Sequence, residues 1–213
     1  MDAFDNTGFA LLREPEPAVQ QGHTLVVLGV SRGGTSAMAG ILHALGIFMG
    51  GSGKPPMFED LYLNKAVRER RDADIQQRIS LYNQQHETWG YKGTVLNHDL
   101  AHYHGLFRRP RYLVVFRDVL AIAKRASISA GHPVPAIMTR QLNEYERICQ
   151  FLQQVSPPAL MLSYEKLCQN PAPAIEAIAE FAGIKAEPAR LQAAEQLLRG
   201  ARDHYLEVSQ RPT

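Results

Sequence analysis

The stretch Gly29-Val30-Ser31-Arg32-Gly33-Gly34-Thr35-Ser36 decides the fold. It follows the apolar run Thr24–Gly29 (TLVVLG), which is typical of a buried parallel strand, and it opens Thr35–Leu45, where apolar residues recur at helical spacing. Glycines between a strand and a helix permit a tight turn whose backbone N–H groups converge on an anion, and the helix start adds its positive dipole end. The stretch therefore predicts an anion site; the alternative is a turn that needs glycine for its shape alone.

Two further apolar runs, Tyr112–Phe116 (YLVVF) and Ala159–Ser163 (ALMLS), are predicted to be buried strands. The remaining periodic segments are predicted to be helices: Met57–Tyr82, Val119–Ala130, Arg140–Gln154, Pro173–Ala182 and Glu187–Leu198. Strands that alternate with helices predict an α/β fold with a central parallel sheet flanked by helices. We expect one domain over residues 1–213, with residues 1–21 forming a loosely ordered N-terminal segment.

Composition excludes several classes of protein. The 213 residues are 45% hydrophobic and 21% charged, which indicates a globular chain. Because 23 Lys and Arg face 21 Asp and Glu, the net charge of +2 disfavours general binding to duplex DNA. No run approaches the roughly 20 apolar residues of a membrane span. The start of the chain lacks the apolar core of a signal peptide, so we expect a cytoplasmic protein in which Cys149 and Cys168 are buried free thiols.

The glycine-rich turn differs from the ATP-binding loop G-x-x-x-x-G-K-[ST]. Gly29 and Gly34 keep the glycine spacing, but Thr35 occupies the lysine position and the cation stands earlier, at Arg32. This pattern resembles the 5′-phosphosulfate-binding loop of sulfotransferases, which usually reads Lys or Arg, then Ser/Gly-Gly-Thr-[ST]. These enzymes use 3′-phosphoadenosine 5′-phosphosulfate (PAPS) as donor and release the bisphosphate PAP. The resemblance implies a P-loop-like three-layer sandwich and donor contacts from Ser31, Arg32, Gly33, Gly34, Thr35 and Ser36.

A second signature follows the strand Tyr112–Phe116. Arg117-Asp118 resembles the family's strand-end Arg-Asp, in which the arginine and a serine eight residues later hold the donor's 3′-phosphate. A guanidinium suits this role because it binds phosphate through two parallel hydrogen bonds. This chain departs from the family, since Val119 replaces the usual proline and Arg125 occupies the serine position. Either Arg125 or Ser127 is expected to complete the site; the alternative for Arg117-Asp118 is a helix cap with an exposed arginine.

Two more segments extend the resemblance. Leu160–Leu167 (LMLSYEKL), followed by Asn170-Pro171 and Phe181–Ile184 (FAGI), is similar in order and spacing to a family element. Tyr164 and Glu165 of this element are expected to tie the sheet to the C-terminal helices. Trp89-Gly90-Tyr91-Lys92 resembles a W-G-x-K element of bacterial members, without the proline that usually follows it.

The acceptor hydroxyl requires a base. Phe58-Glu59 resembles the "F-E" element that supplies the base in Golgi-type and some bacterial sulfotransferases, so Glu59 is our first candidate, the alternative being a first-turn helix glutamate favoured by the dipole. His102 is the reserve candidate, because cytosolic members use a histidine base. His98 and His102 are four residues apart, but no third ligand accompanies them, and we expect no metal.

These features predict an enzyme that transfers a sulfuryl group from PAPS to a hydroxyl of a small molecule, sugar or lipid head group. Arg32 is expected to stabilise the oxygen that links sulfur to the leaving phosphate. Two alternatives remain open. One is a nucleotide or small-molecule kinase with an atypical loop, and the other is a catalytically inactive relative that binds an adenine nucleotide.

Overall fold

The computed structural model describes residues 7–15, 22–51 and 57–209, and within these ranges five strands form one sheet. The strands are β1 (Phe9–Arg13), β2 (His23–Gly29), β3 (Thr88–Lys92), β4 (Arg111–Phe116) and β5 (Ala159–Ser163). The helices are α1 (Thr35–Ala44), α2 (Leu61–Arg68), α3 (Asp72–Gln85), α4 (Leu100–His104), α5 (Val119–Ala130), α6 (Val134–Val155), α7 (Tyr164–Gln169), α8 (Pro171–Phe181) and α9 (Pro188–Ser209), with a 3-10 helix η1 (Thr94–His98).

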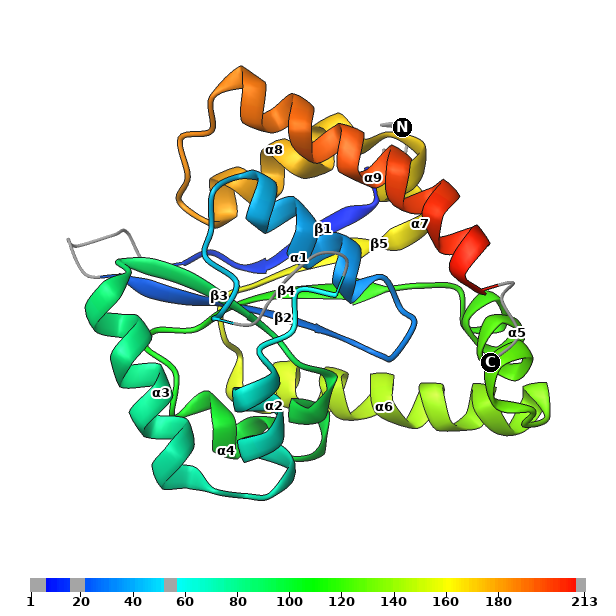
Figure 1. Cartoon of the computed structure of the whole chain (residues 1–213), viewed down its shortest axis with the longest axis horizontal. Helices are drawn as coiled ribbons and strands as arrows, with labels where there is room; N and C mark the ends of the chain where they lie inside the picture. The colour runs from blue at the N-terminus through cyan, green and yellow to red at the C-terminus, as the bar shows by residue number, and fades with distance from the viewer. Residues whose placement is uncertain (1–6, 16–21, 52–56, 210–213) are drawn as a thin grey trace, which may run out of the picture.

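The strand order is β1-β5-β4-β2-β3. β2, β3, β4 and β5 are parallel, whereas β1 pairs antiparallel with β5 at one edge. Parallel strands require crossover connections, and these connections place helices on both faces of the sheet. In Figure 1, α1, α8 and α9 cover one face, while α2, α3, α4 and α6 lie on the other. The three-layer α/β architecture predicted from the sequence is therefore confirmed.

The two faces bury alternate residues of the same strands. In β2, Leu25 and Val27 pack with α1, α8 and α9, whereas Val26 and Leu28 pack with the helices of the opposite face. All seven residues of β2 are buried, which explains its continuous apolar sequence. The sheet is thus fixed between two hydrophobic layers.

The carboxyl ends of the parallel strands meet at one edge of the sheet. Gly29 of β2 pairs with Val115 of β4, and Phe116 of β4 pairs with Ser163 of β5. The turn after β2, Arg117 after β4 and Tyr164 after β5 consequently lie side by side. Crevices at this edge are the usual place for ligands in open α/β sheets.

Several boundaries differ from the sequence-based expectation. Phe9–Arg13 form the edge strand β1, so a loosely ordered segment was the wrong expectation for these residues; 1–6 and 16–21 lie outside the described residues. The single helix expected over Met57–Tyr82 is two helices, because Arg70 adopts a left-handed conformation with φ of 52° between them. Thr88–Lys92 forms a strand that the sequence analysis did not identify.

Two sequence-based expectations concern exposure to solvent and membranes. Both cysteines are free, but neither is fully buried as expected: Cys149 is exposed on α6, and Cys168 is half-buried on α7. Among the described residues, no helix combines the length and apolar character that a membrane crossing would need.

Candidate functional site

The turn after β2 presents open N–H groups at the start of α1. Gly34 is the N-cap of α1 and has a φ of 99°, a left-handed conformation that favours glycine. A Cβ atom at this position would also overlap Cδ2 of the Tyr164 ring. No side chain among the described residues caps α1, whereas Asp60, Asp118 and Ser163 cap α2, α5 and α7. The first-turn N–H groups of α1 are therefore available to an anion.

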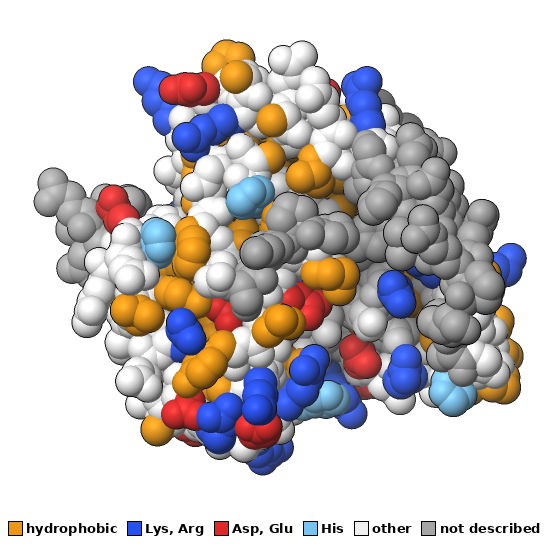
Figure 2. All heavy atoms as spheres, in the orientation of Figure 1, with side chains coloured by type: hydrophobic (Ala, Val, Ile, Leu, Met, Phe, Trp, Pro, Cys, Tyr) orange, Lys and Arg blue, Asp and Glu red, His pale blue; other side chains and the backbone are white. Residues whose placement is uncertain are grey.

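A cavity of about 250 Å³ opens beside this turn. Its lining residues are Ser31, Arg32, Gly34, Thr35, Ser36, Ala37, Met57, Glu59, Lys92, Thr94, Arg117, Arg125 and Tyr164. Four of them carry a cationic side chain and one carries a carboxylate, so the cavity favours anions. On the face in Figure 2, many of the Lys and Arg side chains gather along the lower edge, where acidic side chains lie among them. The cavity differs from that edge because four cationic side chains share it with a single carboxylate.

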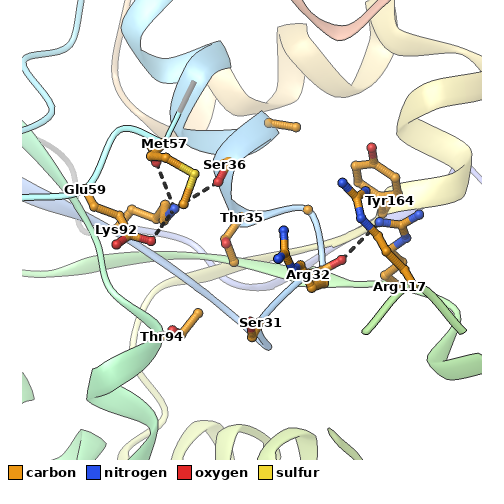
Figure 3. Close-up of a pocket in the computed structure, with 13 residues that line it drawn as sticks. Ser31, Arg32, Thr35, Ser36, Met57, Glu59, Lys92, Thr94, Arg117 and Tyr164 are labelled. Carbon is orange, nitrogen blue, oxygen red and sulfur yellow. Dashed lines mark hydrogen bonds and ion pairs between the residues drawn. The ribbon is translucent and has the colours of Figure 1, made fainter. Parts of the chain in front are cut away.

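Arg117 connects three parts of this site. Its Nη1 donates to the backbone oxygen of Arg32 (3.0 Å), and its guanidinium lies 4.6 Å from the centre of the Tyr164 ring (Figure 3). Tyr145 of α6 accepts a hydrogen bond from the Arg117 backbone N–H at 2.9 Å, which fixes the end of β4. The Arg117 Nε is buried, lies 3.9 Å from Oε1 of Glu165 and makes no hydrogen bond within the described residues. Arg117 is thus held between the loop and Tyr164, with its side chain at the cavity wall.

Lys92, at the end of β3, is the cation on the opposite side of the loop. Its side chain is 2% exposed, and its Nζ donates to Ser36 Oγ (2.9 Å), to Met57 O (2.8 Å) and to Glu59 Oε1 (2.8 Å), as Figure 3 shows. Burial lowers the pKa of Lys92, and the hydrogen bond and charge of Glu59 oppose that shift. Lys92 thus joins the helix start of α1 to the segment that carries Glu59.

Glu59 enters the cavity from the segment before α2. The preceding Phe58 has a φ of 50°, which is unusual for a bulky residue, and its ring is buried 5.2 Å from the ring of His43. The Glu59 side chain is 24% exposed, with Oε1 on Lys92 and Oε2 accepting from Asn64 Nδ2 at 3.2 Å. Its carboxylate is therefore fixed at the cavity wall while it remains accessible to a ligand.

The structure brings most of the predicted site residues together. Ser31, Arg32, Gly34, Thr35, Ser36, Glu59, Arg117 and Arg125 line the cavity. Gly33 does not line it; its N–H donates to Val30 O at 2.9 Å and closes the turn. Ser127 also lies elsewhere, donating from Oγ to His132 O at 2.9 Å.

Neither His102, the reserve candidate for the base, nor the neighbouring His104 lines the cavity. His102 is 41% exposed on α4, where its Nε2 lies 3.0 Å from Asp72 Oδ2. His104 contacts the Tyr112 hydroxyl at 3.0 Å, and burial lowers its pKa. Within the described ranges, no group of three His, Cys, Asp or Glu side chains is arranged to hold a metal ion.

Lys92 is the main site residue to which the sequence analysis assigned no role. The signal was present, because Lys92 is a lone charge that ends the aromatic-rich segment Thr88–Lys92. A lysine at the carboxyl end of a parallel strand lies at the edge where ligands bind. Tyr164, which we expected to tie the sheet to the C-terminal helices, in addition lines the cavity beneath Arg117.

Comparison with known proteins gives matches among solved structures. No model of a known protein family matches the sequence, and no curated protein matches it. The sulfotransferase domain of the Synechococcus PCC 7002 olefin synthase has 16% identity and a TM-score of 0.59, covering 85% of this chain and 80% of its own. The sulfotransferase domain from the curacin biosynthetic pathway has 17% identity and a TM-score of 0.55, covering 83% and 78%. Mouse sulfotransferase SULT7A1, complexed with PAP, has 10% identity and a TM-score of 0.51, covering 90% and 68%. The chain therefore has the sulfotransferase fold.

Proposed function

We propose that this protein transfers a sulfuryl group from PAPS to a hydroxyl group of a small molecule, sugar or lipid head group. The observation that carries the proposal is the division of one cavity into two halves. The uncapped start of α1, Arg32, Arg117 and Arg125 line one half, and the ion pair of Lys92 with Glu59 lines the other. A phosphosulfate donor and an acceptor hydroxyl need these two environments side by side.

The residues of the first half fit the donor. The open N–H groups at the start of α1 suit a 5′-phosphosulfate, and the left-handed Gly34 keeps the loop backbone within reach of it. The guanidinium of Arg117, which lines the cavity, suits the 3′-phosphate. Arg125 also lines the cavity, whereas Ser127 donates to His132 O, so we assign Arg125 rather than Ser127 to this phosphate. Bound PAPS would supply a sulfuryl group attached through an oxygen that departs with PAP.

The second half fits the acceptor. Glu59 takes the hydroxyl proton as the acceptor oxygen bonds to sulfur, because its carboxylate is fixed yet 24% exposed at the cavity. We prefer Glu59 to His102, which pairs with Asp72 outside the cavity. Arg32 and the N–H groups at the start of α1 stabilise the negative charge that develops on the departing phosphate oxygen. Lys92 holds the carboxylate in place through its ion pair.

Ligand binding provides the test that separates this function from a kinase. Titration with PAP should raise the melting temperature without Mg²⁺, corresponding to about 2.7 kcal/mol at a hundredfold excess over Kd. ATP with Mg²⁺ should stabilise the protein much less, because Thr35 replaces the loop lysine. Stabilisation by ATP–Mg²⁺ and none by PAP would refute the proposal.

Transfer itself separates an enzyme from an inactive relative. Radiolabelled PAPS should give sulfated product with a panel of hydroxyl compounds. Glu59→Gln should bind PAP with wild-type affinity and lower kcat by about 10²–10⁴, the usual contribution of a general base. An unchanged kcat in Glu59→Gln would remove Glu59 from the role of base.

A further inference from the structure

A chain of buried polar side chains lies behind Glu59, on the side away from the ligand cavity. Asn64 of α2 is 2% exposed, and its Nδ2 donates to Glu59 Oε2 at 3.2 Å. The Asn64 Oδ1 accepts from the hydroxyl of Tyr91 at 2.6 Å, and Tyr91, on β3, is also buried. Neither Asn64 nor Tyr91 lines the cavity, so neither is placed to contact a ligand there.

The direction of these hydrogen bonds is fixed by chemistry. An ionised carboxylate only accepts hydrogen bonds, so the amide nitrogen of Asn64 must face Glu59. The amide oxygen must then face Tyr91, whose hydroxyl donates. Burial raises the pKa of Tyr91, with smaller contributions from Asp60 and Glu59, which keeps this hydroxyl protonated and able to donate. Both hydrogen bonds are therefore donated in the same direction, from Tyr91 to Asn64 and from Asn64 to Glu59.

Burial of an amide on α2 needs a reason beyond packing. The other buried residues of this helix are Leu63, Ala66 and Val67, which pack in the hydrophobic layer, and an apolar residue at position 64 would avoid desolvating an amide. The amide contacts Glu59, a residue of the cavity, and it does so on the carboxylate oxygen that Lys92 leaves open. Both oxygens of Glu59 are consequently held, one by a cation and one by an amide.

We propose that Asn64, oriented by Tyr91, is a positioning residue that fixes the carboxylate of Glu59 toward the acceptor. The inference rests on the proposed function for the role of Glu59 as base. With Lys92 alone, the carboxylate can rotate about its single contact; with Asn64 as well, its plane is set. Fixing a reacting group matters because a displacement of about 1 Å can cost 10²-fold in rate.

The kinetic test uses Asn64→Leu, which keeps the approximate size of the side chain and removes the amide. We expect kcat to fall about 10- to 100-fold, while KM for PAPS and the Kd for PAP stay within about twofold of the wild-type values. In a Glu59→Gln background, Asn64→Leu should cause no further loss of kcat, because the positioned group is gone. An equal loss in both backgrounds would show that Asn64 acts on stability alone and would overturn the inference.

Tyr91→Phe has a matched control in Tyr82→Phe. Both substitutions remove a buried hydroxyl that hydrogen bonds to a side chain around the start of α2, since the Tyr82 hydroxyl bonds to Asp60. Tyr91→Phe should lower kcat about 3- to 10-fold by releasing the Asn64 amide, and Tyr82→Phe should leave kcat unchanged at a similar cost in stability. Equal kcat losses in the two variants would contradict the inference.

A crystallographic measurement decides the inference independently of activity. In crystal structures of the wild-type protein and of Asn64→Leu, Glu59 should occupy one rotamer in the first and several in the second. An unchanged, single Glu59 rotamer in Asn64→Leu would overturn the inference. If the wild-type protein transferred no sulfuryl group while this difference in Glu59 was observed, the proposed function would fail and the positioning of Glu59 by Asn64 would stand.

Discussion

Helices α1 and α2 both begin beside the same cavity, but only α2 has a side chain that caps its first turn. The N-cap of α1 is Gly34, which supplies no side chain, so the N–H groups stay open. The N-cap of α2 is the buried Asp60, whose Oδ1 accepts from Leu63 N at 2.9 Å and whose Oδ2 accepts from Tyr82. A carboxylate at a helix start occupies the place that a phosphate would take. The start of α1 can therefore bind an anion, as we propose for the donor, whereas the start of α2 is occupied by its own cap.

The largest expected effect comes from adding a side chain at the N-cap of α1, where the N–H groups are open. Gly34→Ala would place a Cβ atom against the Tyr164 ring, on which Arg117 rests, and would hold alanine at a φ of 99°. We expect a loss of about 2–5 kcal/mol in unfolding free energy, from positive φ at about 1–2 and overpacking at about 1–3 kcal/mol. The Kd for PAP, measured by calorimetry, should rise at least about 100-fold because the loop N–H groups and Arg117 both move.

Gly131→Ala is the matched control for this substitution. Gly131 ends α5 with a φ of 67°, but a Cβ atom there would meet nothing within 4 Å. It should therefore cost only the positive-φ part, about 1–2 kcal/mol, and leave PAP binding unchanged. If Gly34→Ala bound PAP within twofold of the wild-type affinity, α1 would not be the phosphate-binding helix start.

The contrast between the two helix starts also explains what could be predicted from sequence. The α1 start is encoded in consecutive residues, Gly29 to Ser36, so the tight turn and its open N–H groups could be predicted from the local sequence. Arg117 was predictable for the same reason, because it directly follows an apolar strand. Lys92 and Glu59 are 33 positions apart in the sequence, and their ion pair depends on how β3 packs against the segment before α2. No local sequence pattern predicts that these two side chains form an ion pair.

The errors in the sequence-based prediction of the fold also arise where the local sequence carries no signal of the structure. β1 is an edge strand with mostly exposed residues, and its pairing with β5 is a tertiary contact that its own sequence does not indicate. The break between α2 and α3 falls at Arg70, in a charged run without glycine or proline, so the left-handed turn has no sequence signal. The β3 strand was missed because Gly90 interrupts a run of only five residues; a Cβ atom there would overlap Met49.

An intermediate effect is expected from removing the side chain that caps α2. Asp60→Ala would remove the cap of α2 and leave the buried hydroxyl of Tyr82 without its carboxylate partner. We expect the unfolding free energy in urea to fall by about 3 kcal/mol, and by about 1 kcal/mol in Asp60→Asn, which keeps an oxygen at the cap. The Kd for PAP should stay within about twofold in both variants. A tenfold weaker affinity in Asp60→Asn would mean that α2 takes part in donor binding.

The smallest effect is expected at a third helix start, that of α5, which combines features of the other two. Asp118 caps α5 by accepting from Ala121 N at 2.9 Å, yet it is exposed and directly follows Arg117. Asp118→Ala should cost about 1 kcal/mol of unfolding free energy through the lost cap. It should also tighten PAP binding by about two- to threefold at low salt, because a negative charge near the proposed 3′-phosphate site is removed, and this gain should shrink at high salt.

Asp118→Asn separates the two roles of this carboxylate, since the amide oxygen keeps the cap and the charge is lost. We expect Asp118→Asn to show the same gain in PAP affinity as Asp118→Ala with most of the stability retained. Calorimetric titrations at two salt concentrations, together with urea denaturation, measure both quantities. Weaker PAP binding in Asp118→Asn would show that the charge at α5 organises Arg117 rather than opposing the phosphate. In that case the open and closed helix starts would cooperate at one site, because a carboxylate cap would support the phosphate bound at α1.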